Sequence, residues 1–418
     1  MKKNLILYSI STAINKGIVL LFFPFLTILL TLEDFGKWNL VIVISSLLVP
    51  ILSLNGAAAI LREGSQDKRL GFTILKYYNI ITLLIGVIMS SLVAFLDLQY
   101  WILYAFIIAS FEAVLLLYLT YLRTLDKAIE YFSIILFKTL LLFLIILYAY
   151  YQKISLYDLL LYHSLVVGVF AFVLSFIVFI KKNLNKKFVF SPIFIFSLVL
   201  IPHGISQWIM SSSDRLILEW LSGSYEVGIY SLSYNIAMIL MLINSAIALS
   251  IPPYMIKNID RWKNENYDHK LMEYYTIFSS VLFFIVVSLY SLDKYYFNIL
   301  GYYGQEMIPM IFIIYLSIYF LGLYYIYANY LFFHKQAYII SKATLYSATF
   351  NIVGTILFVY FFGTIGAAFG TLLAYIYYLY YIRKETLKFE PLLKIPLAKH
   401  ISVFLLVTSF ISLGFYNV

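Results

Sequence analysis

The chain has 418 residues, of which 63% are hydrophobic and 12% are charged, and its formal net charge is +9. Soluble domains carry roughly 25% charged residues, so this composition excludes a water-soluble protein. The absence of cysteine excludes disulfides and thiol chemistry, and the five histidines show no spacing typical of a metal site.

Thirteen long apolar runs predict membrane-spanning helices along the whole chain. Each run has enough residues to cross a hydrocarbon core of about 30 Å as a helix. The first run is longer than the apolar region of a signal peptide, and it lacks a small-residue cleavage site, so we interpret it as a helix. The predicted spans lie near 5–31, 38–60, 72–96, 100–121, 131–150, 159–180, 192–213, 227–251, 271–291, 307–331, 343–361, 364–382 and 400–416.

Basic residues fall mainly on one side of these spans when the loops alternate. With the N-terminus placed in the cytoplasm, most of the 29 Lys and Arg residues lie on the inside, as the positive-inside rule requires. The positive charge is therefore a topology signal, and we expect no nucleic-acid partner. No connection between spans is long enough to form a separate domain. The outside segments hold only Lys37, Lys153, Arg215 and Lys294, and three further lysines lie within spans, at positions 16, 76 and 138.

The junction that follows the first span is repeated 192 residues later. The segment TLEDFGKWNLVIVI at 31–44 aligns with GSYEVGIYSLSYNI at 223–236, which pairs Asp34 with Glu226. In both copies an acidic residue suits the positive end of a helix dipole at the start of the next span. Two parallel repeats of this kind predict an all-α integral membrane protein, with about 12–13 transmembrane helices in two six-helix bundles.

The repeat sets the expected domain organisation. We predict an N-terminal six-helix lobe at 1–180 and a cytoplasmic linker at 181–191, which contains the basic segment KKNLNKK. A C-terminal six-helix lobe is expected at 192–382. The remaining residues, 383–418, would form a cytoplasmic segment and an extra transmembrane helix.

Three stretches of the chain resemble one transporter family. SSSDRLILEWLSGSYEVGIYSLSYNIAMIL is similar to the seventh and eighth helices of Wzx-type polysaccharide (O-antigen) flippases, which share the MOP superfamily with MATE-type multidrug extruders. GIVLLFFPFLTILLTLEDFGKWNLV resembles the first helical hairpin of that family, and NIVGTILFVYFFGTIGAAFGTLLAYI resembles its eleventh-to-twelfth hairpin. The thirteenth span departs from the twelve or fourteen that are usual in the family.

The resemblance implies a MATE-like, V-shaped pair of bundles and a transporter rather than an enzyme. It implies that undecaprenyl-pyrophosphate-linked oligosaccharide repeat units are flipped from the cytoplasmic to the outer face of the bacterial inner membrane by alternating access. The product would be a lipopolysaccharide O-antigen or a capsule. The implied partners are this lipid-linked substrate, the phospholipid bilayer, and a polysaccharide polymerase with its chain-length regulator, and no cofactor is expected.

Charged residues inside the spans are the first candidates for a functional site, because a charge in the hydrocarbon core needs a partner or a cavity. Lys16 lies near the middle of the first span and Lys138 lies within the fifth, where either could hold a pyrophosphate. Glu112 is the mid-membrane carboxylate of the fourth span. Lys16 could instead pair with Glu112 as a structural bridge, and the sequence leaves both interpretations open.

Polar stripes on later spans are expected to line the space between the two lobes. One runs along the seventh span to Asp214 and Arg215, for which an interfacial ion pair at the helix end is the alternative. Another follows the eleventh span from Thr344 to Thr355. The predicted substrate-binding residues are Lys16, Lys138, Arg215, His203, Gln207, Asn235 and Asn351, the predicted ion-coupling residues are Glu112 and Asp214, and no metal site is expected.

Two other functions fit a chain of this kind. A MATE-type multidrug or cation exporter shares the architecture but should carry acidic residues in its cavity, whereas basic residues outnumber the single mid-membrane acid here. A membrane polysaccharide polymerase or ligase usually carries a large outer loop, which no predicted connection provides. The sequence contains no nucleotide-binding P-loop, so the driving force would be an ion gradient or the substrate gradient.

Overall fold

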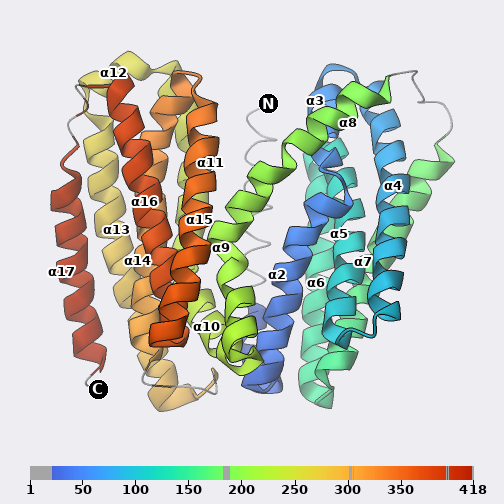
Figure 1. Cartoon of the computed structure of the whole chain (residues 1–418), viewed down its shortest axis with the longest axis horizontal. Coiled ribbons are helices and arrows are strands. Elements are labelled where there is room, and N and C mark those ends of the chain that lie inside the picture. The colour runs from blue at the N-terminus through green and yellow to red at the C-terminus, as the bar shows by residue number, and fades with distance from the viewer. Residues whose placement is uncertain are drawn as a thin grey trace. The chain divides into compact units, whose positions relative to one another are not determined.

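The computed structural model describes residues 21–181, 189–300, 304, 306–391, 393 and 395–416 (Figure 1). Within these residues there are helices and no strands, which confirms the predicted all-α class. Among the described residues, ten helices are long and apolar enough to cross a membrane, or eleven if the bent pair Ser224–Ala237 and Ile239–Ser245 is one span. The predicted first span lies mostly outside the described residues, although 21–29 is helical.

The chain divides into two compact units, Met1–Ile205 and Ser206–Val418. The boundary lies within a helix, whereas the sequence places the division in the linker at 181–191. The helix that follows the linker packs within the first unit, since the Tyr78 hydroxyl donates to the Ser197 hydroxyl at 3.0 Å. The guanidinium of Arg62 also lies 4.3 Å from the ring centroid of Phe196.

In the first unit α5 is the central helix, and α2, α3, α4 and α7 pack against it. Its core gathers side chains such as Phe72, Tyr78 and Leu117, all of which are buried. The helices are α2 (Leu32–Leu52), α3 (Gly56–Gln66), α4 (Lys68–Phe95), α5 (Tyr100–Thr124), α6 (Ala128–Gln152), α7 (Leu156–Ile180) and α8 (Phe190–Val199), while α9 (Ile201–Ser222) crosses into the second unit.

The second unit is built around α14 (Met307–Phe333), and 89% of the most apolar stretch of this helix is buried. The pair α15 and α16 packs closely, because a Cβ added at Gly370 would lie 2.3 Å from the Thr355 hydroxyl oxygen. The last helix, α17, runs beside α13 (Figure 1). The other helices of this unit are α10 (Ser224–Ala237), α11 (Ile239–Lys257), α12 (Ile259–Asn264), α13 (Tyr267–Leu292), η1 (Asp293–Phe297), α15 (Ala337–Phe362), α16 (Thr364–Phe389) and α17 (Leu397–Tyr416).

Three predicted spans are interrupted in the structure, and each interruption has a local cause. The span predicted at 38–60 divides into α2 and α3, because Pro50 lies in the last turn of α2 and Asn55 adopts a left-handed conformation with φ of 51°. The span at 192–213 divides into α8 and α9 beside Pro202. The span at 227–251 bends by 49° where α10 meets α11.

The two copies of the repeat begin their helices at the predicted offset. Helix α2 starts at Leu32, after the Thr31 N-cap, and α10 starts 192 residues later at Ser224, after Gly223. Acidic side chains lie in the first turn of both helices, as the sequence predicts. The long helices α4, α5, α6 and α7 of the first unit are then matched in chain order by α13, α14, α15 and α16 of the second.

Candidate functional site

A buried polar network lies inside the second unit, where α9, α10, α15 and α16 supply its side chains. Its centre is the pair Asp214 and Arg215, whose residues are 1% and 5% exposed. Charged groups are rarely buried this deeply without partners, because the loss of hydration costs several kcal/mol per ion. The contacts of this pair therefore show what stabilises the two charges.

The Asp214 carboxylate accepts hydrogen bonds from three sides. The Tyr230 hydroxyl donates to its Oδ2 atom at 2.5 Å, and the Thr371 hydroxyl donates to the same oxygen at 3.2 Å. The backbone N–H of Arg215 donates to Oδ1 at 2.9 Å. Hydrogen bonds to an ionised acceptor are about twice as strong as neutral ones, so this arrangement stabilises the carboxylate form.

The Arg215 guanidinium lies between its carboxylate neighbour and two tyrosine rings. One terminal nitrogen lies 3.5 Å from Asp214 Oδ1 and donates to the Ser211 carbonyl oxygen at 3.4 Å. The guanidinium carbon is 4.0 Å from the ring centroid of Tyr234, which is a cation–π contact. The Arg215 Nε atom is buried and has no hydrogen-bond partner among the described residues.

The network extends from this pair to α15. The Ser213 hydroxyl donates to Asn351 Oδ1 at 3.0 Å, and Asn351 Nδ2 donates to the Thr371 hydroxyl oxygen at 3.5 Å. Thr371 in turn contacts Asp214, so the chain of bonds returns to α9. Any change in the charge of Asp214 would therefore be felt by α9, α10, α15 and α16 together.

The polar stripe of the eleventh predicted span faces the interior of this unit. All four of its side chains are fully buried on α15, and none is open to the surroundings. Thr344, for example, lies 3.0 Å from the Tyr378 hydroxyl of α16. The sequence places this stripe on the space between the lobes, whereas the structure packs it against α16 because the glycines of α16 allow close approach. The stripe consists of Thr344, Ser347, Asn351 and Thr355.

Three of the predicted site residues, Asp214, Arg215 and Asn351, meet in the network. The contacts described above do not include the other three that were predicted on these spans. His203 and Asn235 are partly exposed, and Gln207 is exposed.

The sequence did not identify Tyr230, Tyr234 and Thr371 as members of the network. The signal for the tyrosines was present, because Tyr230 and Tyr234 are four residues apart on α10, share one face, and belong to the next helix after the charged pair on α9.

A second ion pair lies in the first unit, between α5 and α6. Lys138 Nζ is 2.6 Å from Glu112 Oε1, and the two side chains are 19% and 29% exposed. Both are predicted site residues, and the structure brings them together.

The buried ring of His163 lies 5.3 Å from that of Trp38, and its Nδ1 atom has no hydrogen-bond partner within the described chain. Lys16, which the sequence also offers as a partner of Glu112, lies outside the described residues.

The described residues contain no group of three His, Cys, Asp or Glu side chains that could hold a metal ion. The network around Asp214 instead gathers one carboxylate, three hydroxyl groups and an amide oxygen beside the Arg215 guanidinium.

Comparison with solved structures gives the same fold over almost the whole chain. The lipid II flippase MurJ in an inward closed conformation matches with a TM-score of 0.68 at 13% identity, and 98% of each chain is covered. An inward-facing multidrug resistance MATE family transporter of the MOP superfamily matches with a TM-score of 0.65 at 14% identity, over 91% of this chain and 96% of that one. An outward-facing transporter of the same description matches with a TM-score of 0.61 at 13% identity, over 94% and 97%.

Sequence comparison supplies the family. None of the curated proteins compared with this chain matches it. The family model described as "Polysaccharide biosynthesis protein" matches residues 1–259, which include the first unit, the repeat junctions and the Asp214–Arg215 pair. The protein is thus a multi-pass membrane protein with the fold of the MOP transporters, and it belongs to the polysaccharide biosynthesis protein family.

Proposed function

We propose that this protein flips undecaprenyl-pyrophosphate-linked oligosaccharide repeat units across the bacterial inner membrane by alternating access. The direction is from the cytoplasmic to the outer face, and the product is an O-antigen or capsule polysaccharide. The observation that carries this proposal is the family match over residues 1–259. It is supported by the structural match to a lipid II flippase, which covers 98% of each chain.

The physical task is to carry a polar head past hydrocarbon while the lipid tail stays in the membrane. A pyrophosphate has about two negative charges, and each polar group left unpaired in hydrocarbon costs a few kcal/mol. Lys138 suits a contact with this head, because its side chain is partly exposed and is already paired with the carboxylate of Glu112. A phosphate oxygen can replace that carboxylate. Lys16 has the same proposed role.

The network around Asp214 suits ion coupling rather than substrate contact, because its two charges are almost fully buried. Binding of a proton or cation at Asp214 would weaken its attraction to Arg215 and release the Tyr230 hydrogen bond. Such a change alters the packing of α9 and α10, which is the kind of two-state element that alternating access needs. Glu112 has the second ion-coupling role in this proposal.

The cellular setting follows from the same proposal. The N-terminus lies in the cytoplasm, as the distribution of basic residues predicts, and a polymerase with its chain-length regulator uses the flipped units on the outer face.

The direct test is deletion of the gene in its own host, followed by analysis of lipid-linked intermediates. Single repeat units should accumulate on the cytoplasmic face, and restoring the gene should clear them. Unchanged repeat-unit levels, together with a gain in sensitivity to cationic drugs, would favour the multidrug exporter instead.

A further inference from the structure

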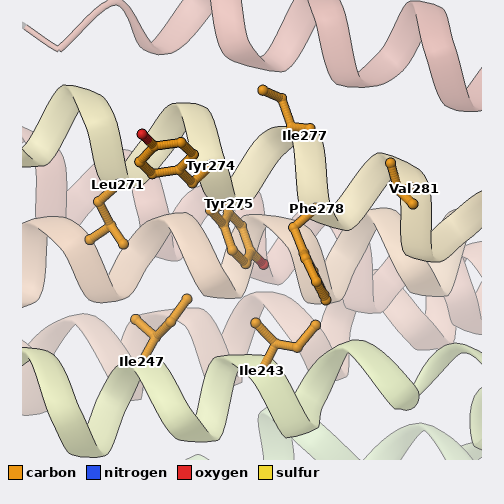
Figure 2. A pocket seen from close by; sticks show the side chains of 8 residues that line it. All are labelled: Ile243, Ile247, Leu271, Tyr274, Tyr275, Ile277, Phe278 and Val281. Atoms are coloured by element: carbon orange, nitrogen blue, oxygen red, sulfur yellow. The ribbon is translucent and has the colours of Figure 1, made fainter.

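An apolar pocket of about 420 Å³ lies between α11 and α13 in the second unit (Figure 2). In Figure 2, Leu271, Tyr275 and Phe278 point from α13 toward Ile243 and Ile247 on α11. The lining side chains are all aliphatic or aromatic. Two of them are tyrosines, and the hydroxyl of Tyr275 at the base already donates a hydrogen bond. The pocket therefore suits a hydrocarbon chain better than a sugar or an ion.

The base of the pocket is fixed by bonds that hold the two helices on α14. The Tyr275 hydroxyl donates to Asn244 Oδ1 at 2.9 Å, and Asn244 Nδ2 donates to the Ile318 carbonyl oxygen at 2.9 Å. The Tyr275 ring stacks on that of Tyr319 with a centroid distance of 5.3 Å. A Cβ at Gly322 would lie 1.9 Å from the Tyr275 oxygen, so glycine is needed for this arrangement. The contacts of Tyr275 therefore fix the shape of the base of the pocket.

The pocket lies near the end of the helices that carries exposed positive charge. Helix α11 ends at Lys257, and α12 connects it to the start of α13, so these two helix ends lie on the same side of the membrane. Lys270 directly precedes the lining residue Leu271, and both lysines are exposed. The basic-residue distribution places this side in the cytoplasm. If the anionic head group of a lipid bound at the two lysines, its hydrocarbon chain would lie beside the pocket.

We propose that this pocket holds the polyprenyl chain of the lipid carrier on the cytoplasmic side, with the carrier phosphate at Lys257 and Lys270. This rests on the proposed function, in which the substrate is linked to such a carrier. Transfer from lipid tails to an apolar pocket gives no hydrophobic gain. Selectivity must therefore come from the fit of a methyl-branched chain between branched and aromatic walls, and from attraction of the phosphate to the two lysines.

The test is equilibrium binding of undecaprenyl phosphate to the purified full-length protein in detergent. Ile247→Trp, which fills the pocket, should weaken binding by about fivefold or more, equivalent to about 1 kcal/mol. Leu289→Trp is the control, because Leu289 is exposed on α13 outside the pocket and its replacement should leave binding unchanged. If Ile247→Trp does not elute as a folded protein, Val281→Phe fills the pocket from the other wall.

The phosphate site is tested with the double variant Lys257→Gln and Lys270→Gln, which should weaken binding and remove most of its salt dependence. Phosphatidylglycerol carries a similar charge on straight chains, and it should compete poorly. Equal competition by phosphatidylglycerol, or wild-type affinity in the pocket-filling variants, would overturn the proposal. A protein that binds the probe through this pocket but whose deletion leaves repeat units unchanged would contradict the proposed function alone.

Discussion

The two units use the same repeated junction for different chemistry. In the second unit the junction aromatic Tyr230 bonds to the Asp214 carboxylate and lies beside Thr371, the eighth residue of α16. In the first unit the matching aromatic, Trp38, packs instead on His163, the eighth residue of α7. The junction aromatic meets α7 directly at His163 in the first unit, whereas in the second unit it shares the Asp214 carboxylate oxygen with Thr371 of α16.

The difference between the units lies in what faces that aromatic. The position 192 residues before Asp214 is Phe22, whose ring stacks on that of Phe143 with a centroid distance of 5.7 Å. The first unit therefore has an aromatic residue at the position where the second unit has a charged one. Buried charges cost stability that aromatic packing would supply, and for this reason we propose the network of the second unit as the main place of ion coupling.

The largest expected effect comes from removing one partner of the buried pair. Arg215→Ala leaves the Asp214 carboxylate buried without its cation, and should lower the free energy of unfolding by about 3–5 kcal/mol. Chemical denaturation of the purified protein in detergent measures this. Adding Asp214→Asn should recover most of the loss, since no buried charge remains. A double variant as unstable as the single one would mean that the two charges do not stabilise each other.

Removing the Tyr230 hydroxyl should have the next largest effect on the free energy of unfolding, and the first unit has no equivalent group. Tyr230→Phe deletes a hydrogen bond to a buried carboxylate, which should cost about 1.5–3 kcal/mol of unfolding free energy. In a double-mutant cycle most of this cost should disappear in the Asp214→Asn background. Trp38→Phe serves as the matched change in the first unit, and its effect should simply add to that of Asp214→Asn.

The partly exposed pair of the first unit, Lys138 and Glu112, should matter for transport more than for stability. Lys138→Ala leaves a partly exposed carboxylate without its cation, so it should lower the unfolding free energy by less than Arg215→Ala does, but it should strongly reduce export of repeat units. Lys138→Arg should keep part of the activity, since a cation for phosphate remains. Lys127→Ala is the control, because Lys127 forms an exposed pair with Glu130 at 2.5 Å and should export normally.

The smallest effect is expected at the cluster that joins α12, α14 and α16. Burial alone would raise the pKa of Glu390, but hydrogen bonds from Lys263 at 2.7 Å and His334 at 2.8 Å outweigh it and lower the pKa below 4.5. A carboxylate whose folded pKa is lowered stabilises the fold above its unfolded pKa, and this contribution disappears as the pH falls through the folded value. The thermal unfolding temperature should therefore fall as the pH drops below 4.5. In Glu390→Gln the unfolding temperature should depend less on pH in this range. If the pH dependence of Glu390→Gln matched that of the wild type, Glu390 would not be the source of the stability lost at low pH.

The sequence predicts the helices well because membrane spans need long apolar runs. The predicted span at 100–121 corresponds to α5 at Tyr100–Thr124, and 364–382 corresponds to α16 at Thr364–Phe389. The interruptions were harder, since they depend on single residues such as Pro50 and on one left-handed conformation at Asn55. The Pro202 break was foreseeable, because proline lacks the N–H that continues a helix.

The site was only partly predictable, because the sequence shows which residues share a helix face but does not show which helix that face meets. Asp214, Arg215 and Asn351 stand out as polar residues in apolar runs, and they do meet. The close approach of α15 to α16, which brings Asn351 within reach of Thr371, depends on Gly370 and is a property of two packed helices. For the same reason the pairing of Glu112 with Lys138 could not be chosen from sequence over a pairing with Lys16.

The central claim is that ion coupling resides in the charged network of the second unit. The most direct measurement is flipping of a fluorescent lipid-linked oligosaccharide by the protein in sealed proteoliposomes, with proton or sodium gradients imposed in turn. The wild-type rate should rise with one of these gradients, and Asp214→Asn should lose that response while the protein remains folded. A variant that keeps the full gradient response would contradict the assignment of coupling to Asp214.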